Sequence, residues 1–276
     1  MKYKIAAVIP TFNPPNGFCD LIKSLVEKVQ YVIIVDNASE NHFEIKQCFN
    51  TLNYVYKSKV ELLSNYENLG IAKALNDGVE KIIPKKVDFI LTLDQDTMLL
   101  DISLDEIIDK AYSYKPNKIG LIALSSEEYD GQEFTEVSIA ITNGNLIPSS
   151  VFNFVKYRDS FFIDQIDHDF SANLRRLGYS MLRHNRKSLE HKIGIFKDGR
   201  TYEKPFRIYY IFRNLTILYL ERKISFNFYY HQQRFWAMKQ LKSKKNSLLD
   251  FLFPAITGIV HGLFKIEGFN KRFRPY

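Results

Sequence analysis

The stretch Ile90-Leu91-Thr92-Leu93-Asp94-Gln95-Asp96 places a short apolar run directly before two carboxylates that are separated by one residue. The apolar run has the length of a buried β-strand. Carboxylate oxygens are ligands that Mg²⁺ and Mn²⁺ prefer, and these ions are usually held by one or two carboxylates plus the phosphates of a substrate. The stretch therefore predicts a strand that ends at a metal–diphosphate site, although an acidic pair that only forms a turn would give the same pattern.

Further apolar runs alternate with segments of helical character. The strand-like runs are residues 5–9, 31–35, 60–63, 89–93 and 119–124, and the helical segments are residues 18–29, 71–83 and 103–114. Strands that alternate with helices predict an α/β fold with a mainly parallel central sheet flanked by helices. In such sheets, ligands bind beyond the carboxyl ends of the strands.

Four polar clusters each follow one of these strands. They are Pro10-Thr11-Phe12-Asn13, Asp36-Asn37-Ala38-Ser39, residues 65–70 and Asp94-Gln95-Asp96. Because parallel strands end at the same edge of a sheet, we expect the clusters to converge there. The chain contains neither a Gly-x-Gly-x-x-Gly nor a Gly-x-x-x-x-Gly-Lys-Ser/Thr loop. This argues against a dinucleotide oxidoreductase and against a P-loop ATPase.

Size and cysteine content indicate an ordinary globular protein. The 276 residues, 46% of them hydrophobic, are enough for one large α/β domain or one domain with a smaller appendage. The two cysteines, Cys19 and Cys48, form no recognisable disulfide framework or metal-site spacing. They predict two unpaired thiols and a reducing compartment, which favours a cytoplasmic location.

Neither end of the chain predicts a membrane-spanning segment. Residues 1–10 lack the long apolar region and cleavage site of a signal peptide, so we expect them to form a first strand. The apolar stretch 248–264 is interrupted by Asp250, Pro254 and His261, whereas a spanning helix needs about 20 mainly apolar residues. No transmembrane helix is therefore predicted.

The net charge of +7 is concentrated near the C-terminus. Residues 205–276 contain 13 Lys and Arg against 3 Asp and Glu, and they hold 17 of the 40 aromatic residues. We therefore divide the chain into a catalytic region, residues 1–204, and a basic, aromatic-rich helical region, residues 205–276. Such a composition fits a surface that is peripheral to an anionic membrane. It fits a helical subdomain with a solvated basic face equally well.

The ordered set of motifs resembles family 2 glycosyltransferases with a GT-A fold. The resemblance rests on residues 8–13, 35–39, 68–76 and 93–96. Further motifs are similar to the bacterial rhamnosyltransferase-like group, namely the Asp-Gln-Asp form of the metal motif, residues 162–170, residues 189–194 and Arg213-Asn214. The resemblance implies an inverting hexosyltransferase that uses a dTDP- or UDP-sugar donor and Mn²⁺ or Mg²⁺. It also implies a saccharide or lipid-linked saccharide acceptor in surface polysaccharide synthesis.

The resemblance implies donor-binding roles for the residues at the predicted edge. Asp36 and Thr11 would recognise the base, together with Pro10 and Asn13. The Asn68-x-Gly70 turn opens a helix whose N-H groups favour anions, so Asn68, Gly70 and Asn76 would face the phosphates or ribose. Asp94 and Gln95 would contact the ribose or sugar, and Asn143-Gly144 would lie beneath the sugar or acceptor. Plain turn formation or helix capping would explain Asp36 and Asn68 without any ligand.

The remaining implied roles concern the metal, the base and an arginine. Asp96 would bind the cation, with His191 of the His-x-x-Gly element as a further ligand. Asp167 would be the general base, although Ile166 replaces the acidic partner that usually precedes it and Asn173 replaces a later arginine. Asp164 and Asp169 complete this acidic cluster, which could instead pair only with the helix dipole. Arg213 would contact a diphosphate or be an arginine of an interfacial helix.

Two other classes of function share some of these features. A sugar-phosphate nucleotidyltransferase uses a similar platform, but residues 10–17 contain no Lys or Arg for its usual basic loop. A non-catalytic membrane or nucleic-acid binding protein would use the basic aromatic region alone. We expect no nucleic-acid partner.

Overall fold

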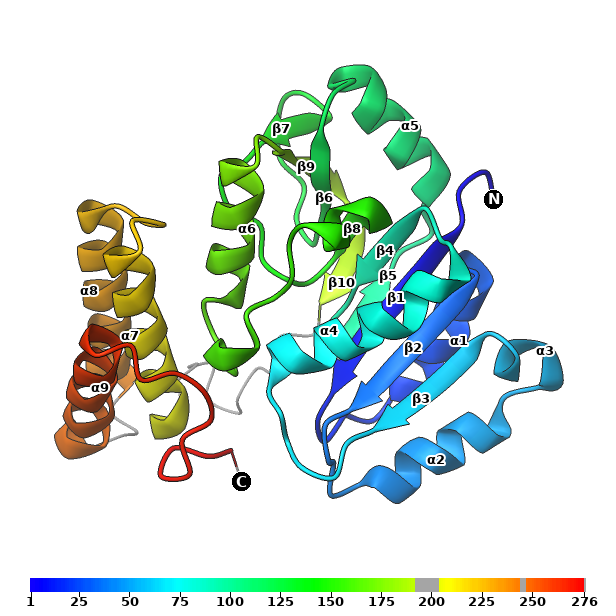
Figure 1. The fold of residues 1–276 in the computed structure, drawn as a ribbon. Coiled ribbons are helices and arrows are strands. Elements are labelled where there is room, and N and C mark those ends of the chain that lie inside the picture. Colours follow the sequence, from blue (N-terminus) through cyan, green and yellow to red (C-terminus); the bar gives the residue numbers. More distant parts are fainter. Residues whose placement is uncertain (192–203, 244–246, 276) are drawn as a thin grey trace.

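The computed structural model describes residues 1–191, 204–243 and 247–275, and the side chains of His191 and of residues 241–243 lie outside the described part. Within these ranges, one sheet has the strand order β3-β2-β1-β4-β8-β6-β9-β7 and a small second sheet pairs β10 with β5 (Figure 1). The strands are β1 (Ile5–Thr11), β2 (Tyr31–Asp36), β3 (Val60–Ser64), β4 (Phe89–Thr92), β5 (Thr97–Leu99), β6 (Ile119–Ser125), β7 (Phe134–Glu136), β8 (Asn145–Pro148), β9 (Ser180–Lys187) and β10 (Leu189–His191).

The main sheet is parallel over the half that carries the polar clusters. β1 pairs in parallel with β2 and β4, and β2 pairs in parallel with β3. β8 runs antiparallel between β4 and β6, and β7 is an antiparallel edge strand beside β9. The five strands expected from the sequence are confirmed, and their carboxyl ends point to one edge.

Helices cover both faces of this sheet and form a separate bundle at one side (Figure 1). The α-helices are α1 (Phe18–Lys28), α2 (His42–Thr51), α3 (Tyr54–Lys57), α4 (Ile71–Ile82), α5 (Leu104–Tyr114), α6 (Ile166–Arg176), α7 (Pro205–Leu220), α8 (Phe226–Ser243) and α9 (Leu248–Leu263). Short 3₁₀ turns are η1 (Ile83–Lys85), η2 (Ser149–Asn153) and η3 (Asp159–Phe161). None of the helices in the described ranges has the length and apolar character needed to cross a bilayer.

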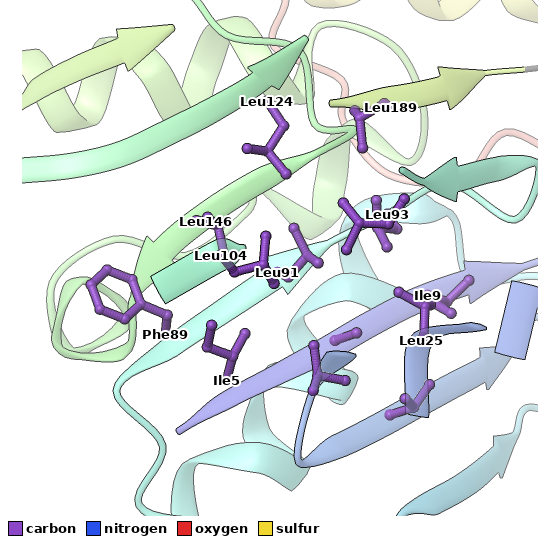
Figure 2. Packing of buried hydrophobic residues seen from close by; sticks show 14 of the residues in the cluster. Ile5, Ile9, Leu25, Phe89, Leu91, Leu93, Leu104, Leu124, Leu146 and Leu189 are labelled. Atoms are coloured by element: carbon purple, nitrogen blue, oxygen red, sulfur yellow. The ribbon is translucent and has the colours of Figure 1, made fainter. Parts of the chain in front are cut away.

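Alternation along β1 explains why the sheet is buried on both faces. Ile5, Ala7 and Ile9 pack with α1, α2 and α5, whereas Ala6 and Val8 pack with α4, α6 and the end of α7. Figure 2 shows the first of these cores, in which Ile5 and Ile9 lie near leucines of β4, β8 and α1. Two-sided burial accounts for the continuous apolar runs of the parallel strands.

One sequence expectation about the N-terminal half is wrong. Cys19 of α1 and Cys48 of α2 form a disulfide, with their Cα atoms 5.6 Å apart. Their sequence separation of 29 gave no local spacing signal, because the pair meets only after α2 packs beside α1. The two cysteines are therefore not the unpaired thiols that the sequence predicted.

Candidate functional site

Hydrogen bonds join the loops that follow β1 and β2. The Asn37 N-H donates to the Thr11 carbonyl at 2.7 Å, and the Asn13 N-H donates to the Ser39 hydroxyl at 2.8 Å. The Asn13 side chain in turn accepts from the N-H of Glu40. The first two polar clusters are thus joined into one unit. Asn13 contributes by binding Ser39 and Glu40 in the loop that follows β2.

Asp36 lies at the centre of this unit. It is only 1% exposed and is the register partner of Thr11 across the β1/β2 pair. Its Oδ1 accepts from the N-H and hydroxyl of Ser39, and its Oδ2 contacts the His42 Nδ1 at 2.5 Å. A carboxylate oxygen has two lone pairs, so Oδ2 can accept one further hydrogen bond.

Thr11 supplies an unsatisfied polar atom beside Asp36. Its hydroxyl oxygen is buried and has no hydrogen-bond partner among the described residues. Leaving a buried hydroxyl unpaired costs about 1–3 kcal/mol, so such atoms in a native protein usually have a ligand or water as partner. The Thr11–Asp36 pair therefore fits a ligand that both donates and accepts hydrogen bonds, as a pyrimidine ring does.

The third cluster is attached to the second through Asn37. The Asn37 amide donates to the Asn68 side chain and to the Gly70 carbonyl, both at 3.0 Å, and its oxygen accepts from the N-H of Leu69. The Asn68 oxygen also accepts from the N-H of Gly70. Asn68 is thus directed into its own turn rather than toward an open phosphate site.

Gly70 brings this turn against the loop that precedes α6. A Cβ at Gly70 would lie 2.4 Å from the Phe162 carbonyl oxygen, and the backbone φ is +87°. The N-H of Ile71, at the start of α4, donates to that same carbonyl at 2.8 Å. The contact joins the donor-side loops to the segment that carries Asp164 and Asp167.

The Asp-Gln-Asp loop is fixed by two amide side chains. Gln95 accepts from the Phe12 N-H at 2.8 Å and donates to the Phe12 carbonyl at 3.1 Å. Asn143 accepts from the Asp94 N-H at 3.0 Å and donates to the Thr97 hydroxyl at 2.8 Å. Gln95 and Asn143 therefore set the shape of the loop on which both carboxylates stand.

Gly144 and His191 are brought to this loop by β10. A Cβ at Gly144 would lie 2.4 Å from the Leu189 side chain, so this glycine makes room for β10 rather than for a ligand. Figure 2 shows Leu189 above Leu93, close to Leu124. β10 pairs antiparallel with β5, and the backbone of His191 is opposite Thr97, the residue after Asp96. The His191 side chain and Gly194 lie outside the described residues.

The residues at this loop fit a divalent cation. Asp94 and Asp96 offer carboxylate oxygens, and the β10/β5 register brings position 191 to the same loop. Among the described residues, no group of three or more His, Cys, Asp or Glu side chains is arranged to hold a metal alone. Two carboxylates completed by substrate phosphates are the usual way in which proteins bind Mg²⁺.

Asp167 stands in the first turn of α6 with one oxygen fixed and one available. Its Oδ1 accepts from the His168 N-H at 2.9 Å and contacts the His168 Nδ1 at 2.9 Å. Its Oδ2 has no partner among the described residues, and the side chain is 19% exposed. The His168 ring also packs on Phe228 of α8. The carboxylate is therefore oriented but accessible.

Tyr157 packs against the helix that carries Asp167. Burial raises the pKa of the Tyr157 hydroxyl well above its usual range, and the charge of Asp167 adds to this increase. The ring stacks on Phe170 of α6. The Thr92 hydroxyl, two residues before Asp94, donates to the Thr142 carbonyl, and the buried Tyr157 hydroxyl has no hydrogen-bond partner in the described part of the chain. Tyr157 is therefore a buried hydroxyl that packs on the helix carrying Asp167.

The other two carboxylates of the acidic cluster are occupied by ion pairs. Asp169 is 2% exposed and is 2.6 Å from the Lys223 ammonium, with Arg158 at 3.5 Å. Asp164 contacts the Arg207 guanidinium at 2.6 Å. Both pairs attach the α6 region to the C-terminal helices, so Asp167 differs from its neighbours in being exposed to an incoming group.

Comparisons with known proteins agree with this arrangement. The model of the family "Glycosyl transferase family 2" matches residues 6–176. The chain belongs to glycosyltransferase family 2. It is 30% identical over 251 residues to the dTDP-rhamnosyl transferase RfbF of Shigella flexneri, which covers 79% of this chain and 80% of RfbF. The solved structure of S. aureus TarS matches 86% of this chain and 43% of TarS, with a TM-score of 0.55 and 13% identity.

The fold is therefore of the GT-A type, and the chain is a nucleotide-sugar glycosyltransferase. In this glycosyltransferase, hydrogen bonds or direct packing connect the clusters that contain Pro10 to Asn13, Asp36, Asn68 to Gly70 and Asp94 to Asp96. The expected convergence of the polar clusters is confirmed.

Two predicted donor-binding residues have internal partners instead. Asn76 donates to the Tyr157 carbonyl and to the Asp159 side chain, beneath α4. Arg213 is fully buried and donates to the carbonyls of Gly268, Ser160 and Phe161. Its pKa is lowered by burial. Neither side chain reaches a diphosphate in this arrangement, because each is enclosed by the backbone that it holds.

The candidate site also contains residues that sequence patterns did not reveal. His42 pairs with Asp36, and the Tyr157 ring stacks on Phe170 in the helix that carries Asp167. Sequence could have indicated the first pair, because Asp36 ends a strand and His42 begins a helix only six residues later. Tyr157 has no such signal, since its partners are in β4 and α6.

Proposed function

We propose that this glycosyltransferase transfers a sugar, with rhamnose the first candidate, from a dTDP-linked donor to a saccharide or lipid-linked saccharide. The relative RfbF is described as a dTDP-rhamnosyl transferase, which favours rhamnose and thymidine over other donors. UDP-sugars are the alternative donors. The placement of Asp167, partly exposed in the first turn of α6 with Oδ1 held by His168 and Oδ2 accessible, is the observation that carries the proposal.

The nucleoside would bind at the end of β1 and β2. The Asp36 Oδ2 would accept the ring N-H of thymine or uracil, and the Thr11 hydroxyl would donate to a ring carbonyl. His42 and Ser39 orient the Asp36 carboxylate, so the acceptor atom is fixed before the base arrives. This pairing satisfies the buried Thr11 hydroxyl, whose lack of a partner supports the assignment.

Asp96, with His191 as a further ligand, would hold a Mn²⁺ or Mg²⁺ ion against the donor diphosphate, where the ion would offset charge on the departing group. Asp94 would contact the ribose or sugar of the donor. Gln95 and Asn143 are positioning residues for this loop, because each binds its backbone. Polysaccharide synthesis at the cytoplasmic side of a cell membrane is the setting that such donors and acceptors imply.

Asp167 would serve as general base in a single displacement. The acceptor hydroxyl oxygen forms a bond to the anomeric carbon as the bond from that carbon to the diphosphate oxygen breaks. The hydroxyl proton moves to the Asp167 Oδ2, and the nucleoside diphosphate leaves with inversion at the anomeric carbon. General bases must lie within hydrogen-bond reach of the proton that they remove, and the accessible Oδ2 meets this need.

The first experiment is a thermal-shift comparison of the purified chain with dTDP, dTDP-rhamnose, UDP-glucose and ATP, each with and without Mn²⁺. A ligand that binds only the folded state at 100 times its Kd stabilises it by about 2.7 kcal/mol. We expect dTDP and dTDP-rhamnose to raise the melting temperature more than the others, and only with Mn²⁺. Equal shifts for all ligands, or release of pyrophosphate from dTTP and a sugar phosphate, would contradict the proposal.

A further inference from the structure

The helix α9 presents two chemically different faces. Phe251, Ala255, Gly258 and Gly262 are buried, and the two glycines bring α9 against α7. A Cβ at Gly258 would lie 2.5 Å from the Tyr209 carbonyl oxygen, and one at Gly262 would lie 2.6 Å from the Thr216 Cβ. Small residues at every fourth position let two helix backbones approach closely. This inner face is fully used by the contact with α7.

The opposite face of α9 is apolar and exposed. Its side chains, which we call the outer face, are between 37% and 75% exposed and are Leu249, Leu252, Phe253, Ile256, Val260 and Leu263. Their spacing places them on one side of the helix. Single exposed apolar residues are normal, but a contiguous apolar surface of this kind marks a site of interaction.

Basic side chains border the outer face. Lys265, Lys271, Arg272 and Arg274 follow α9 and are exposed. The Arg272 guanidinium lies 4.3 Å from the centre of the Phe253 ring, which fixes positive charge directly at the apolar surface. The single acidic residue of α9, Asp250, is engaged in a capping box with Ser247. Apolar side chains next to unopposed basic groups are complementary to an anionic lipid surface.

We propose that the outer face of α9 docks into the headgroup region of an anionic membrane, with the helix parallel to the bilayer plane. The 16 residues of α9 extend about 24 Å, which is less than the hydrocarbon thickness of about 30 Å. A second copy of the chain is disfavoured as the occupant, because a two-fold contact through this face would bring its basic side chains near one another.

The segment that carries the basic side chains also connects α9 to the catalytic region. The segment after α9 returns to the catalytic region, where the Gly268 N-H donates to the Ser160 carbonyl and Glu267 contacts the Arg158 guanidinium at 2.5 Å. In Figure 1 the α7–α9 bundle stands beside α6, the helix that begins next to Asp167.

The test is co-sedimentation of the full chain with vesicles of 30% phosphatidylglycerol in phosphatidylcholine, without any sugar nucleotide. We expect binding that falls with added salt and that the triple variant Leu249→Ser/Leu252→Ser/Ile256→Ser weakens by at least tenfold. Each basic charge near an anionic surface strengthens binding about fivefold. Replacing both Arg272 and Arg274 by Gln should therefore weaken vesicle binding by about 25-fold at low salt.

The matched control is the double variant Phe43→Ser/Tyr54→Ser, which removes aromatic side chains of α2 and α3 that are even more exposed than those of the outer face. It should bind vesicles as the unaltered chain does. Absence of vesicle binding, or equal binding by the triple variant, would overturn the proposal. A dimer in sedimentation velocity that the triple variant abolishes, without lipid binding, would assign the face to a second copy instead. The result is independent of glycosyl transfer, because no donor is present.

Discussion

Gln95 holds the backbone of Phe12 through two hydrogen bonds, one to its N-H at 2.8 Å and one to its carbonyl at 3.1 Å. The residue in the middle of the Asp-Gln-Asp motif thus belongs to the loop after β1 as much as to the loop after β4. It sets the separation between the predicted base site and the predicted metal site. A donor that bridges the two sites needs this separation to be fixed before it binds.

Replacing Gln95 by Leu should therefore impair donor binding and lower stability. The change leaves the partly buried Phe12 N-H and carbonyl unpaired, which we expect to cost about 1–3 kcal/mol. The KM for the donor should rise more than kcat falls, because the carboxylates themselves remain. Urea unfolding and donor titration check the two effects. Gln47→Leu, at an exposed position of α2, is the control and should change neither.

Replacing Lys223 by Met should strongly destabilise the contact between α6 and the C-terminal bundle. It removes the 2.6 Å partner of Asp169, whose carboxylate is 2% exposed. Breaking a buried ion pair by removing one member costs about 3–5 kcal/mol, because the other charge stays buried. Because the Arg158 guanidinium, 3.5 Å from Asp169, still offsets part of its charge, we expect a loss of stability near the lower end of this range. A double variant with Asp169→Asn should recover part of the loss, and failure to recover would show that the pair is not the cause.

Stability should decrease below about pH 6.5 because of His184. Burial lowers the pKa of this side chain from its usual value of 6.5, despite the opposing effect of Glu133. The folded state therefore binds fewer protons than the unfolded state. The contribution is fully present above the unfolded pKa and is lost as the pH falls toward the folded pKa.

His184→Asn should flatten the profile of unfolding free energy between pH 7 and 5, measured by urea denaturation. Some slope should remain from His261, whose pKa burial also lowers. His231→Asn, on the exposed side of α8, is the control. An unchanged slope in the His184 variant would contradict the assignment.

The sequence predicted the strands of the parallel half well, because burial on both faces makes their apolar runs continuous. It did not predict β7, β8 or β10, which are three or four residues long. These strands exist only through pairing with distant partners, such as Leu146 opposite Leu91. β9 contains Arg183, His184 and Asn185, so its polar sequence concealed a strand.

In the candidate site, too, some features follow from local sequence and others from distant contacts. The positions of polar residues at strand ends predicted which of them gather at one edge, since the sheet topology alone determines where strands end. Which of them are available to a ligand depends on hydrogen bonds between residues far apart in sequence. Asn143 and Arg213 carry polar groups suited to a donor, yet Asn143 binds the Asp94 backbone 49 residues away and Arg213 binds backbone carbonyls 52 or more residues away. Local sequence patterns cannot predict such long-range hydrogen bonds.

The most direct measurement is the transfer rate of the Asp167→Asn variant with dTDP-rhamnose, Mn²⁺ and a saccharide acceptor, together with its affinity for dTDP. Asparagine keeps the shape and the exposure of the side chain, but it cannot take up a proton, and general bases typically contribute 10²- to 10⁴-fold to rate. We predict a loss of about a thousandfold in transfer, with unchanged dTDP affinity and melting temperature. Transfer at the unaltered rate would remove Asp167 from the reaction and contradict the account.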